Sequence, residues 1–267
     1  MKNGASSIED ICVAGITPFT TIDFPGRLAG VFYLQGCPWR CRYCYNSEFW
    51  PLPPDSHYSF IENQCSPDVP FRFLKSSIGT PAGHRVPLEK ILEFLNARKG
   101  HLDGIVFSGG EPTIHERLPV WMKAVKDMGF EIGLHTGGMV PERIKEVLPL
   151  CDWVGMDIKA PFGLYEKVTQ IKGSGELARQ SAALVLAGGV AYEFRTTFHP
   201  ELFSEEDVLE IARELVPMGC THYTLQMFRP DHCPDKELRE SGIPTAGISA
   251  MLRQTLKSLF PNFLVRE

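Results

Sequence analysis

No stretch of this 267-residue chain approaches the run of about 18 apolar residues that a membrane-spanning helix requires. The first ten residues are polar and do not predict a secretory signal peptide. Basic charge is not in excess either, because the net charge is −5 at pH 7. An acidic balance argues against a nucleic-acid groove as the main surface. We therefore expect a cytoplasmic protein that binds neither a membrane nor nucleic acid.

Several common catalytic signatures are also missing. The chain has no G-x-G-x-x-G turn, no P-loop and no G-x-S-x-G elbow. It therefore lacks the sequence marks of Rossmann dinucleotide binding, of P-loop nucleotide hydrolysis and of serine hydrolases. Its histidines are scattered without metal-ligand spacing. Eight cysteines in a chain without a signal peptide are expected as reduced thiols rather than as disulfides.

Three cysteines stand close together, as Cys37, Cys41 and Cys44 in a C-x3-C-x2-C spacing. A closed structural zinc site takes four ligands and usually pairs two C-x2-C knuckles, but no second knuckle follows. Thiolates also ligate iron–sulfur clusters, and a [4Fe–4S] cube has four irons to hold. Three thiolates leave one iron open to a small molecule. We predict such a cluster on these cysteines.

The remaining cysteines are isolated in the sequence. A second cluster built from them is disfavoured, because cluster cysteines usually occur at tight spacings. Two of them, Cys151 and Cys220, are expected as small apolar residues near a core. The isolated cysteines are Cys12, Cys65, Cys151, Cys220 and Cys233.

Short apolar segments alternate with amphipathic helical patterns from residue 30 onward, as in parallel sheets covered on both faces. The predicted strands are 31–35, 104–107, 131–134, 153–156, 191–197 and 222–227. The predicted helices lie at 88–95, 118–125, 141–148, 204–215 and 248–259. Ser204 followed by Asp207 predicts an N-terminal cap for the fourth of these helices. The pattern predicts a parallel α/β sheet, either open and doubly wound or curled into a barrel.

Polar residues follow two of these strands at the end where such sheets place their chemistry. The segment S-G-G-E-P at 108–112 has paired glycines, which let a ligand approach the backbone closely. A tight connection without binding is the alternative. Asp157 and Lys159 share one face of the next but one strand. They predict recognition of a zwitterion or a ribose, or else a structural ion pair.

Glu193, Arg195 and Thr197 share one face of the fifth predicted strand. An arginine in an otherwise apolar strand is costly unless it is paired or bound to an anion. A carboxylate-binding Arg195 at the mouth of the sheet and a plain pair between Glu193 and Arg195 both satisfy this condition. We favour the carboxylate-binding role.

One proline-rich region, 51–87, interrupts the alternation of strands and helices and shows no clear period. Long loops in compact domains are usually functional or mobile. We expect an N-terminal tail at 1–16 and one core domain at 17–267. Within the core, 51–87 is an inserted loop and 231–267 is a C-terminal extension.

The cysteine triplet, followed by S-G-G-E-P and by M-D-I-K at 156–159, resembles the radical S-adenosylmethionine (SAM) superfamily. The segment T-I-D-F-P-G at 21–26 is similar to one that precedes the cluster loop in activases of glycyl-radical enzymes. Further segments resemble activating proteins of anaerobic (class III) ribonucleotide reductase. These are LQGCPWRCRYC, DGIVFSGGEPT, VGMDIKAP and EFRTTFHPELFSEED. The resemblance runs from about residue 17 to about residue 230.

The resemblance implies a partial (β/α)6 TIM-like barrel with an N-terminal extension and a C-terminal helix. It also implies an oxidoreductase in which Cys37, Cys41 and Cys44 hold a [4Fe–4S] cluster whose open iron binds SAM. Reductive cleavage of SAM would give a 5′-deoxyadenosyl radical, which takes a hydrogen from a glycine Cα of a partner protein. The implied partners are a glycyl-radical enzyme and an electron donor of flavodoxin or ferredoxin type.

A set of SAM-binding residues is implied in the same way. The glycine pair at 109–110 would meet the methionine amine with support from Glu111, and the charged strand ends would hold the ribose or carboxylate. The end of the sixth predicted strand, 226–229, would line the adenosine. The implied set is Tyr43, Tyr45, Gly109, Gly110, Glu111, Thr136, Asp157, Lys159, Arg195, Gln226 and Arg229.

Three features depart from the resemblance. Tyr45 stands where relatives usually carry histidine, and the insertion at 51–87 is long. His135 stands where many carry an aspartate that helps to hold a cation, so we expect that cation site to be absent or rebuilt. One alternative is a radical SAM enzyme for a small molecule or peptide, such as a 7-carboxy-7-deazaguanine synthase-like enzyme or a maturase. Another is a zinc- or cluster-holding interaction module without chemistry.

Overall fold

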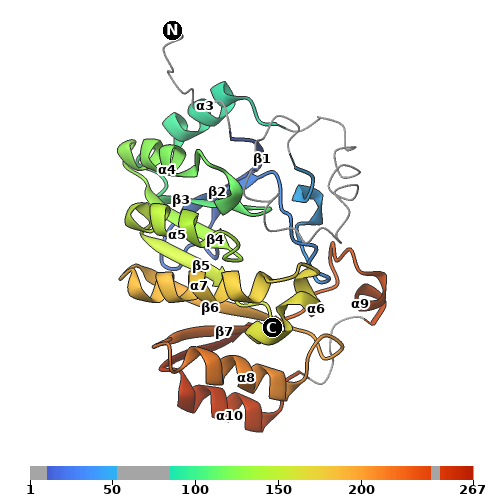
Figure 1. The fold of residues 1–267 in the computed structure, drawn as a ribbon. Helices are drawn as coiled ribbons and strands as arrows, with labels where there is room; N and C mark the ends of the chain where they lie inside the picture. The colour runs from blue at the N-terminus through green and yellow to red at the C-terminus, as the bar shows by residue number, and fades with distance from the viewer. Residues whose placement is uncertain (1–10, 53–84, 242–246, 267) are drawn as a thin grey trace.

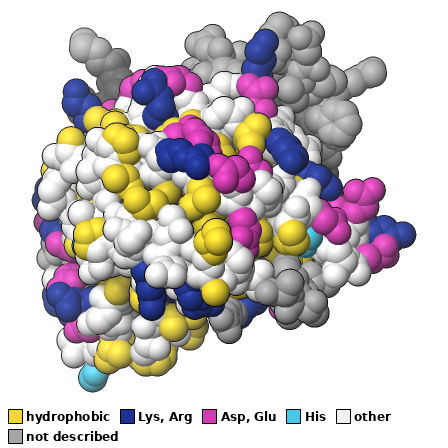
Figure 2. Space-filling view, turned by 90° about the horizontal axis from the view of Figure 1, so that it is seen from below, with side chains coloured by type: hydrophobic (Ala, Val, Ile, Leu, Met, Phe, Trp, Pro, Cys, Tyr) yellow, Lys and Arg dark blue, Asp and Glu magenta, His cyan; other side chains and the backbone are white. Residues whose placement is uncertain are grey.

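A computed structural model describes residues 11–52, 85–241 and 247–266. Most of the predicted insertion at 51–87 lies outside these residues, as does Cys65. Among the helices within the described ranges, none is long and apolar enough to cross a membrane. Figure 2 presents one face of the molecule, on which basic and acidic side chains are interspersed with apolar ones.

Within the described ranges, the strands form a single sheet whose spatial order follows the chain from β1 to β8. β1 pairs antiparallel with β2, and each later neighbour is parallel. The end strands β1 and β8 do not pair with each other in this sheet, so the barrel is not closed. The strands are β1 (Val13–Thr20), β2 (Ala29–Leu34), β3 (Gly104–Gly109), β4 (Glu131–Thr136), β5 (Trp153–Asp157), β6 (Ala191–Phe198), β7 (His222–Met227) and β8 (Asn262–Arg266).

In Figure 1 the helices α3, α4, α5, α7, α8 and α10 follow one another from top to bottom in chain order, while the short helices α6 and α9 lie to the right. A doubly wound sheet would reverse its strand order at a switch point, whereas this order never reverses. The partial barrel is therefore confirmed over the doubly wound alternative. The helices are α3 (Leu88–Arg98), α4 (Leu118–Asp127), α5 (Pro141–Val147), α6 (Tyr165–Thr169), α7 (Ser174–Ala187), α8 (Glu205–Leu215), α9 (Lys236–Ser241) and α10 (Ala250–Leu259).

All six predicted strands are present, as β2 to β7. The sequence reading missed the two edge strands, β1 and β8. β1 is only half-buried along most of its length and contains Pro18, so it lacks the continuous apolar run of the inner strands. It begins at Val13, before the predicted boundary between tail and core, while the division into domains stays a prediction. β8 is a short edge strand within the predicted C-terminal extension.

The five predicted helices are present as α3, α4, α5, α8 and α10. The cap of α8 is confirmed, because Asp207 N–H donates to Ser204 Oγ and Ser204 N–H donates back to Asp207 Oδ2. Helix α7 was missed. It buries small side chains such as Ala178, Ser181 and Ala182 rather than a stripe of large apolar ones.

Two apolar clusters fill the two faces of the sheet. The larger lies between the sheet and the helices and includes Phe32, Phe107 and Trp121. The smaller gathers Phe24 and Trp153 with aliphatic residues of β2 and β3. Because successive strand residues alternate in direction, these two clusters occupy opposite faces. The sheet is thus covered by helices outside and by a small apolar plug inside.

Phe24 of the T-I-D-F-P-G segment forms the centre of that inner plug. Its ring is 3% exposed and stacks on Trp153 with centroids 5.9 Å apart. Two strand glycines make room for it, since a Cβ on Gly104 would lie 2.8 Å from Phe24 Cε1 and one on Gly133 would lie 3.2 Å from Phe24 Cδ1. The segment therefore closes the inside of the sheet near the amino ends of the strands, away from their carboxyl ends.

Replacing Phe24 by alanine is expected to destabilise the apoprotein by about 3–5 kcal/mol, because it leaves a cavity between strands that have only glycine there. Urea unfolding under anaerobic conditions measures the change. Ile22→Ala, two residues away with its side chain 80% exposed, is the matched control and should shift stability by less than about 0.5 kcal/mol. Equal effects of both substitutions would contradict the plug role.

Candidate functional site

The three clustered cysteines lie on the loop between β2 and the short 3-10 helix at Ser47–Phe49. Gly36 turns the chain out of β2 with a φ of +108°, a left-handed conformation that suits glycine. Its N–H donates to Phe49 O at 2.7 Å, and Cys37 N–H donates to Trp50 O at 3.2 Å. The loop is thereby closed on itself, and all three cysteines line one pocket.

Burial keeps these thiols neutral in the metal-free protein. Removal from water raises the pKa of Cys41 to about 12, although nearby Lys159 opposes the change. It also raises the pKa of Cys37 and of Cys44. Thiolates become stable here only when a cation replaces the protons, so metal binding at this loop releases protons.

The geometry bears on which metal centre the loop can hold. Within the described ranges, no three Cys, His, Asp or Glu side chains converge closely enough to bind a single metal ion. A closed zinc site needs its ligands around one centre. A cubane instead meets each thiolate at a different iron, and thiolates are its usual ligands. The donor set therefore fits a [4Fe–4S] cluster with three protein ligands better than a zinc ion.

The glycine pair at 109–110 permits close contact between two loops. A Cβ on Gly109, whose φ is +114°, would lie 2.3 Å from Leu34 N, and one on Gly110 would lie 2.2 Å from Gly36 O. No other residue fits there without moving the cluster loop. Gly110 N–H donates to Leu34 O at 2.8 Å, which makes the segment a tight connection. Gly109 and Gly110 also line the pocket.

Glu111 is buried and braces the loops that follow β3 and β4. Its Oε1 accepts from Thr113 N–H at 3.1 Å, from Thr113 Oγ1 at 2.6 Å and from Thr136 Oγ1 at 2.7 Å. Its Oε2 accepts from Gly137 N–H at 2.7 Å. A buried carboxylate is tolerated only when hydrogen-bonded in this way. These contacts brace the loops, while the role of Glu111 in binding the methionine amine stays a prediction.

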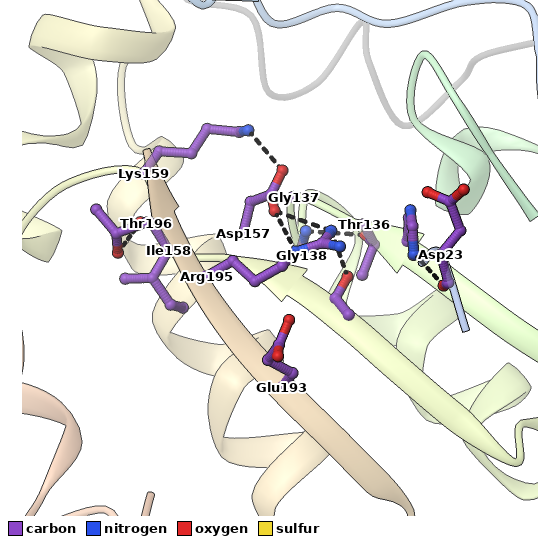
Figure 3. A network of polar contacts seen from close by, with 12 residues as sticks. Asp23, Thr136, Gly137, Gly138, Asp157, Ile158, Lys159, Glu193, Arg195 and Thr196 are labelled. Atoms are coloured by element: carbon purple, nitrogen blue, oxygen red, sulfur yellow. Dashed lines mark hydrogen bonds and ion pairs between the residues drawn. The ribbon is translucent and has the colours of Figure 1, made fainter. Parts of the chain in front are cut away.

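Asp157, Lys159 and Arg195 form a charged network on the pocket wall (Figure 3). Arg195 Nε donates to Asp157 Oδ1 at 3.0 Å, and Lys159 Nζ lies 3.4 Å from Asp157 Oδ2. Burial alone would raise the pKa of Asp157, but the two cations hold it below its usual value. Burial would lower the pKa of Lys159, but the neighbouring Asp157 carboxylate acts in the opposite direction, and the pKa is raised. Asp157 and Lys159 therefore stabilise each other in their charged forms.

The alternative that the sequence left open for Arg195, a plain pair with Glu193, is wrong. Glu193 does not pair with Arg195. Its Oε2 instead accepts from Arg266 on β8 at 2.8 Å, while Arg195 turns to Asp157 on β5. Arg266 lies far along the chain, so neighbouring strand positions could not reveal it. Glu193 Oε1 is buried without a hydrogen-bond partner.

His135 lies on the pocket wall and is neutral. Burial lowers its pKa to about 4, with Arg195 acting in the same direction. The ring stacks edge-on against Trp153, and its Nε2 lies 2.8 Å from Asp23 O, to which a neutral Nε2–H donates. This histidine carries no negative charge with which to hold a cation.

The structure places most of the predicted site residues around one pocket. Tyr43 lies beneath Lys159, whose Nζ is 5.8 Å from the ring centroid. Gln226 and Arg229 are not among the pocket-lining residues, although Arg229 N–H donates to Tyr45 Oη at 2.7 Å. The predicted residues that line the pocket are Cys37, Cys41, Tyr43, Cys44, Tyr45, Gly109, Gly110, Glu111, Thr136, Asp157, Lys159 and Arg195. Their individual roles remain predictions.

The sequence reading missed three pocket residues on the cluster loop and just after it: Trp39, Asn46 and Trp50. Trp39 is 2% exposed and lies against Gly137. A Cβ added to Gly137 would lie 2.8 Å from Trp39 Cζ3. An aromatic residue between two cluster cysteines was an available signal, because it must be buried beside the pocket. Asn46 gave no such signal.

Comparisons with known proteins agree with this geometry. A Methanocaldococcus jannaschii protein named "Putative glycyl-radical enzyme activating enzyme" is 28% identical over 261 residues, which covers 95% of each chain. The 7-carboxy-7-deazaguanine synthase of Thermococcus kodakarensis is 29% identical over 136 residues, or 50% of each chain. The pyruvate formate-lyase 1-activating enzyme of Escherichia coli K12 is 29% identical over 150 residues, covering 52% of this chain and 48% of the relative.

Among solved structures, Streptococcus suis SuiB bound to its precursor peptide SuiA matches with a TM-score of 0.57 at 10% identity. The match covers 89% of this chain and 48% of that one, and it supports the fold alone. The Radical SAM superfamily pattern matches residues 31–191, a span that contains the three cysteines, the glycine pair and the charged end of β5. The chain therefore belongs to the radical SAM superfamily, whose enzymes use a [4Fe–4S] cluster and S-adenosylmethionine.

Proposed function

We propose that this chain activates a glycyl-radical enzyme by removing a hydrogen atom from a glycine Cα of that partner. The observation that carries the proposal is similarity along 95% of both chains to an archaeal relative named for this activity. Shorter similarity to a pyruvate formate-lyase activating enzyme covers about half of each chain and supports the same class. The three-thiol pocket at the strand ends fits the cofactors that such a reaction needs.

The residues of the pocket divide the work of the reaction. Cys37, Cys41 and Cys44 would hold the [4Fe–4S] cluster, which when reduced would supply the electron for reductive cleavage of SAM. Lys159 and Arg195, which line the pocket, would offer positive charge to the carboxylate of SAM. The buried aromatic rings of Trp39 and Tyr43 exclude water beside the thiols.

Anaerobic ribonucleotide reductase is the partner that we propose within this class. The support is the similarity of several segments, above all the one that spans β6 and the start of α8, to activating proteins of that enzyme. An electron donor of flavodoxin or ferredoxin type would reduce the cluster. The overall reaction would consume one electron and one SAM and would move one hydrogen atom from the glycine Cα to the 5′ carbon. The products would be methionine, 5′-deoxyadenosine and a glycyl radical on the partner.

A second candidate is an enzyme that acts on a small molecule, as 7-carboxy-7-deazaguanine synthase does. The observation in its favour is 29% identity to the Thermococcus enzyme over half of each chain. The activase remains the leading proposal, because its similarity extends over nearly the whole chain. The two candidates would share the cluster and SAM and would differ in the substrate on which the radical acts.

Anaerobic incubation with reductant, SAM and anaerobic ribonucleotide reductase is expected to produce a glycyl doublet in the electron paramagnetic resonance spectrum of the reductase. Cys44→Ala should abolish both the doublet and SAM cleavage, because the cluster loses one of its three ligands. Cys12→Ala, which removes a half-buried thiol outside the pocket, is the control and should keep both.

The other outcomes separate the candidates. Cleavage of SAM without a doublet on the reductase would rule out that partner. Formation of 7-carboxy-7-deazaguanine from the substrate of the Thermococcus enzyme, measured by mass spectrometry, would favour the second candidate. Absence of both cluster and cleavage after reconstitution would contradict the enzyme assignment itself.

Replacing Lys159 by methionine tests whether the charged network binds SAM. Methionine keeps much of the buried stem and removes the charge, so KM for SAM is expected to rise about tenfold, equivalent to about 1.4 kcal/mol. Lys167→Met on the exposed side of α6 should leave KM unchanged. Iron content is measured alongside. An unchanged KM in Lys159→Met would mean that Lys159 forms only a structural ion pair with Asp157.

A further inference from the structure

The cluster loop has little regular structure of its own, yet its thiols must be held in place. Between Cys37 and Cys44 it forms no helix or strand, and its bends are connected by few internal hydrogen bonds. A metal site needs its ligands fixed to within a fraction of an ångström, which loops achieve only through contacts with other elements. Backbone hydrogen bonds from Cys37 to Trp50 and from Arg40 to Thr169 fix the first half of the loop, and a separate set of contacts fixes the half that begins at Cys41.

Arg42, directly after the second cluster cysteine, is held by three separate groups. Its N–H donates to Val168 O of α6 at 3.1 Å. Its carbonyl oxygen accepts from the Cys233 thiol at 3.3 Å. Its guanidinium donates from Nε to Asp235 Oδ2 at 2.5 Å. The backbone on both sides of the residue and its side chain are therefore all tied to other parts of the chain.

Cys233 and Asp235 belong to one segment, 228–241. This segment follows β7 and finishes in α9 (Figure 1). Asp235 starts that helix, because its Oδ1 accepts from Leu238 N–H at 3.2 Å and its carbonyl accepts from Arg239 N–H at 3.0 Å. Cys233 is 1% exposed, and its carbonyl accepts from Arg239 Nη1 at 2.9 Å. The segment is thus internally rigid where it meets the loop.

A second contact joins the same segment to the loop just beyond Cys44. Tyr45 stacks on Phe228 with ring centroids 6.2 Å apart, and Tyr45 Oη accepts from Arg229 N–H at 2.7 Å. The segment therefore meets the cluster loop at residues 42 and 45, which directly follow the last two cluster cysteines, Cys41 and Cys44. The thiols of Cys41 and Cys44 are therefore each restrained by a contact one residue away in the chain.

We infer that segment 228–241 is a clasp for the iron–sulfur loop, and that Arg42, Cys233 and Asp235 are positioning residues for the cluster. The ion pair is well placed for this role, since the side chains of Arg42 and Asp235 are only 26% and 16% exposed. Exposed ion pairs contribute little, whereas hydrogen-bonded pairs shielded from water contribute more. The thiol of Cys233 acts here as a hydrogen-bond donor and not as a cluster ligand.

The clasp concerns the cluster and is independent of the partner protein. Its test therefore uses iron retention and the spectrum of the reduced cluster, without any partner. A failure of the clasp would leave the activase proposal untouched, and a failure of the activase proposal would leave the clasp untouched.

Asp235→Asn removes the charge with almost no change in size. In the reconstituted protein, we expect iron to be lost to a chelator about tenfold faster than in the wild type under anaerobic conditions. The spectrum of the reduced cluster with SAM is expected to broaden, because the last two thiols are less fixed. Glu237→Gln is the matched control on the same helix, since Glu237 lies 3.5 Å from Arg42 but is 86% exposed, and it should retain iron as the wild type does.

The charge-swapped double variant Arg42→Asp with Asp235→Arg restores the pair in reverse. We expect it to recover most of the iron retention that Asp235→Asn loses, a recovery that a purely structural role of either residue alone would not give. Retention in Asp235→Asn equal to that in Glu237→Gln would overturn the proposal. So would a double variant that loses iron faster than Asp235→Asn does.

Cys233 gives a test that does not depend on the ion pair, should Asp235→Asn fail to fold. Cys233→Ser keeps a donor for Arg42 O and is expected to retain iron within about twofold of the wild type. Cys233→Ala removes the donor and is expected to lose iron several times faster, while the urea midpoint of the apoprotein serves to measure any general loss of stability. Equal iron retention in the serine and alanine variants, with folding intact, would refute the clasp.

Discussion

A single buried carboxylate joins the loops on which the pocket is built. Glu111 accepts hydrogen bonds from Thr113, Thr136 and Gly137, so the loops after β3 and β4 are fixed to each other. Gly137 in turn packs on Trp39 of the cluster loop. A buried charge without these donors would cost several kcal/mol, so the three loops can adopt this arrangement only together.

The glycines follow from the same constraint. Glu111 fixes the loop after β3 in place. The backbone of this loop at 109–110 lies against β2 and Gly36, with no space for a Cβ. Glu111 N–H then donates to Gly36 O at 2.8 Å, which connects the brace to the start of the cluster loop. The S-G-G-E-P segment is therefore both a tight connection and a wall of the pocket, and the two interpretations of its sequence are not exclusive.

The sequence predicted the inner part of the molecule well, because apolar strands and a tight cysteine spacing are local signals. The same signals fail at the edges of the sheet, where β1 and β8 are partly exposed and carry polar residues. They also fail for α7, whose packing against Gly138 through Ser181 requires small side chains. Periodicity of large apolar residues cannot reveal a helix that is buried by its small ones.

Long-range polar pairs were the least predictable feature of the site. The i, i+2 rule placed Asp157 with Lys159 correctly, although β5 ends at Asp157 and Lys159 lies two residues beyond it. It could not show that Glu193 pairs with Arg266 or that Arg42 pairs with Asp235, because those partners lie 73 and 193 residues apart. Cys233 stood alone in the sequence for the same reason. Its partner is a backbone carbonyl on the cluster loop, which no spacing of cysteines encodes.

The charges on the pocket wall also limit how tightly a zwitterion can bind. Asp157 pairs with both Lys159 and Arg195 in the protein alone, so its one negative charge offsets only part of their positive charge. A ligand carboxylate must compete with Asp157 for these cations, and its affinity reflects the difference between the two pairings and not the whole of either. The wall remains stable without ligand, and a ligand is held well only if it also bonds elsewhere in the pocket. In a radical SAM enzyme, the open iron beside the three thiolates is that second anchor.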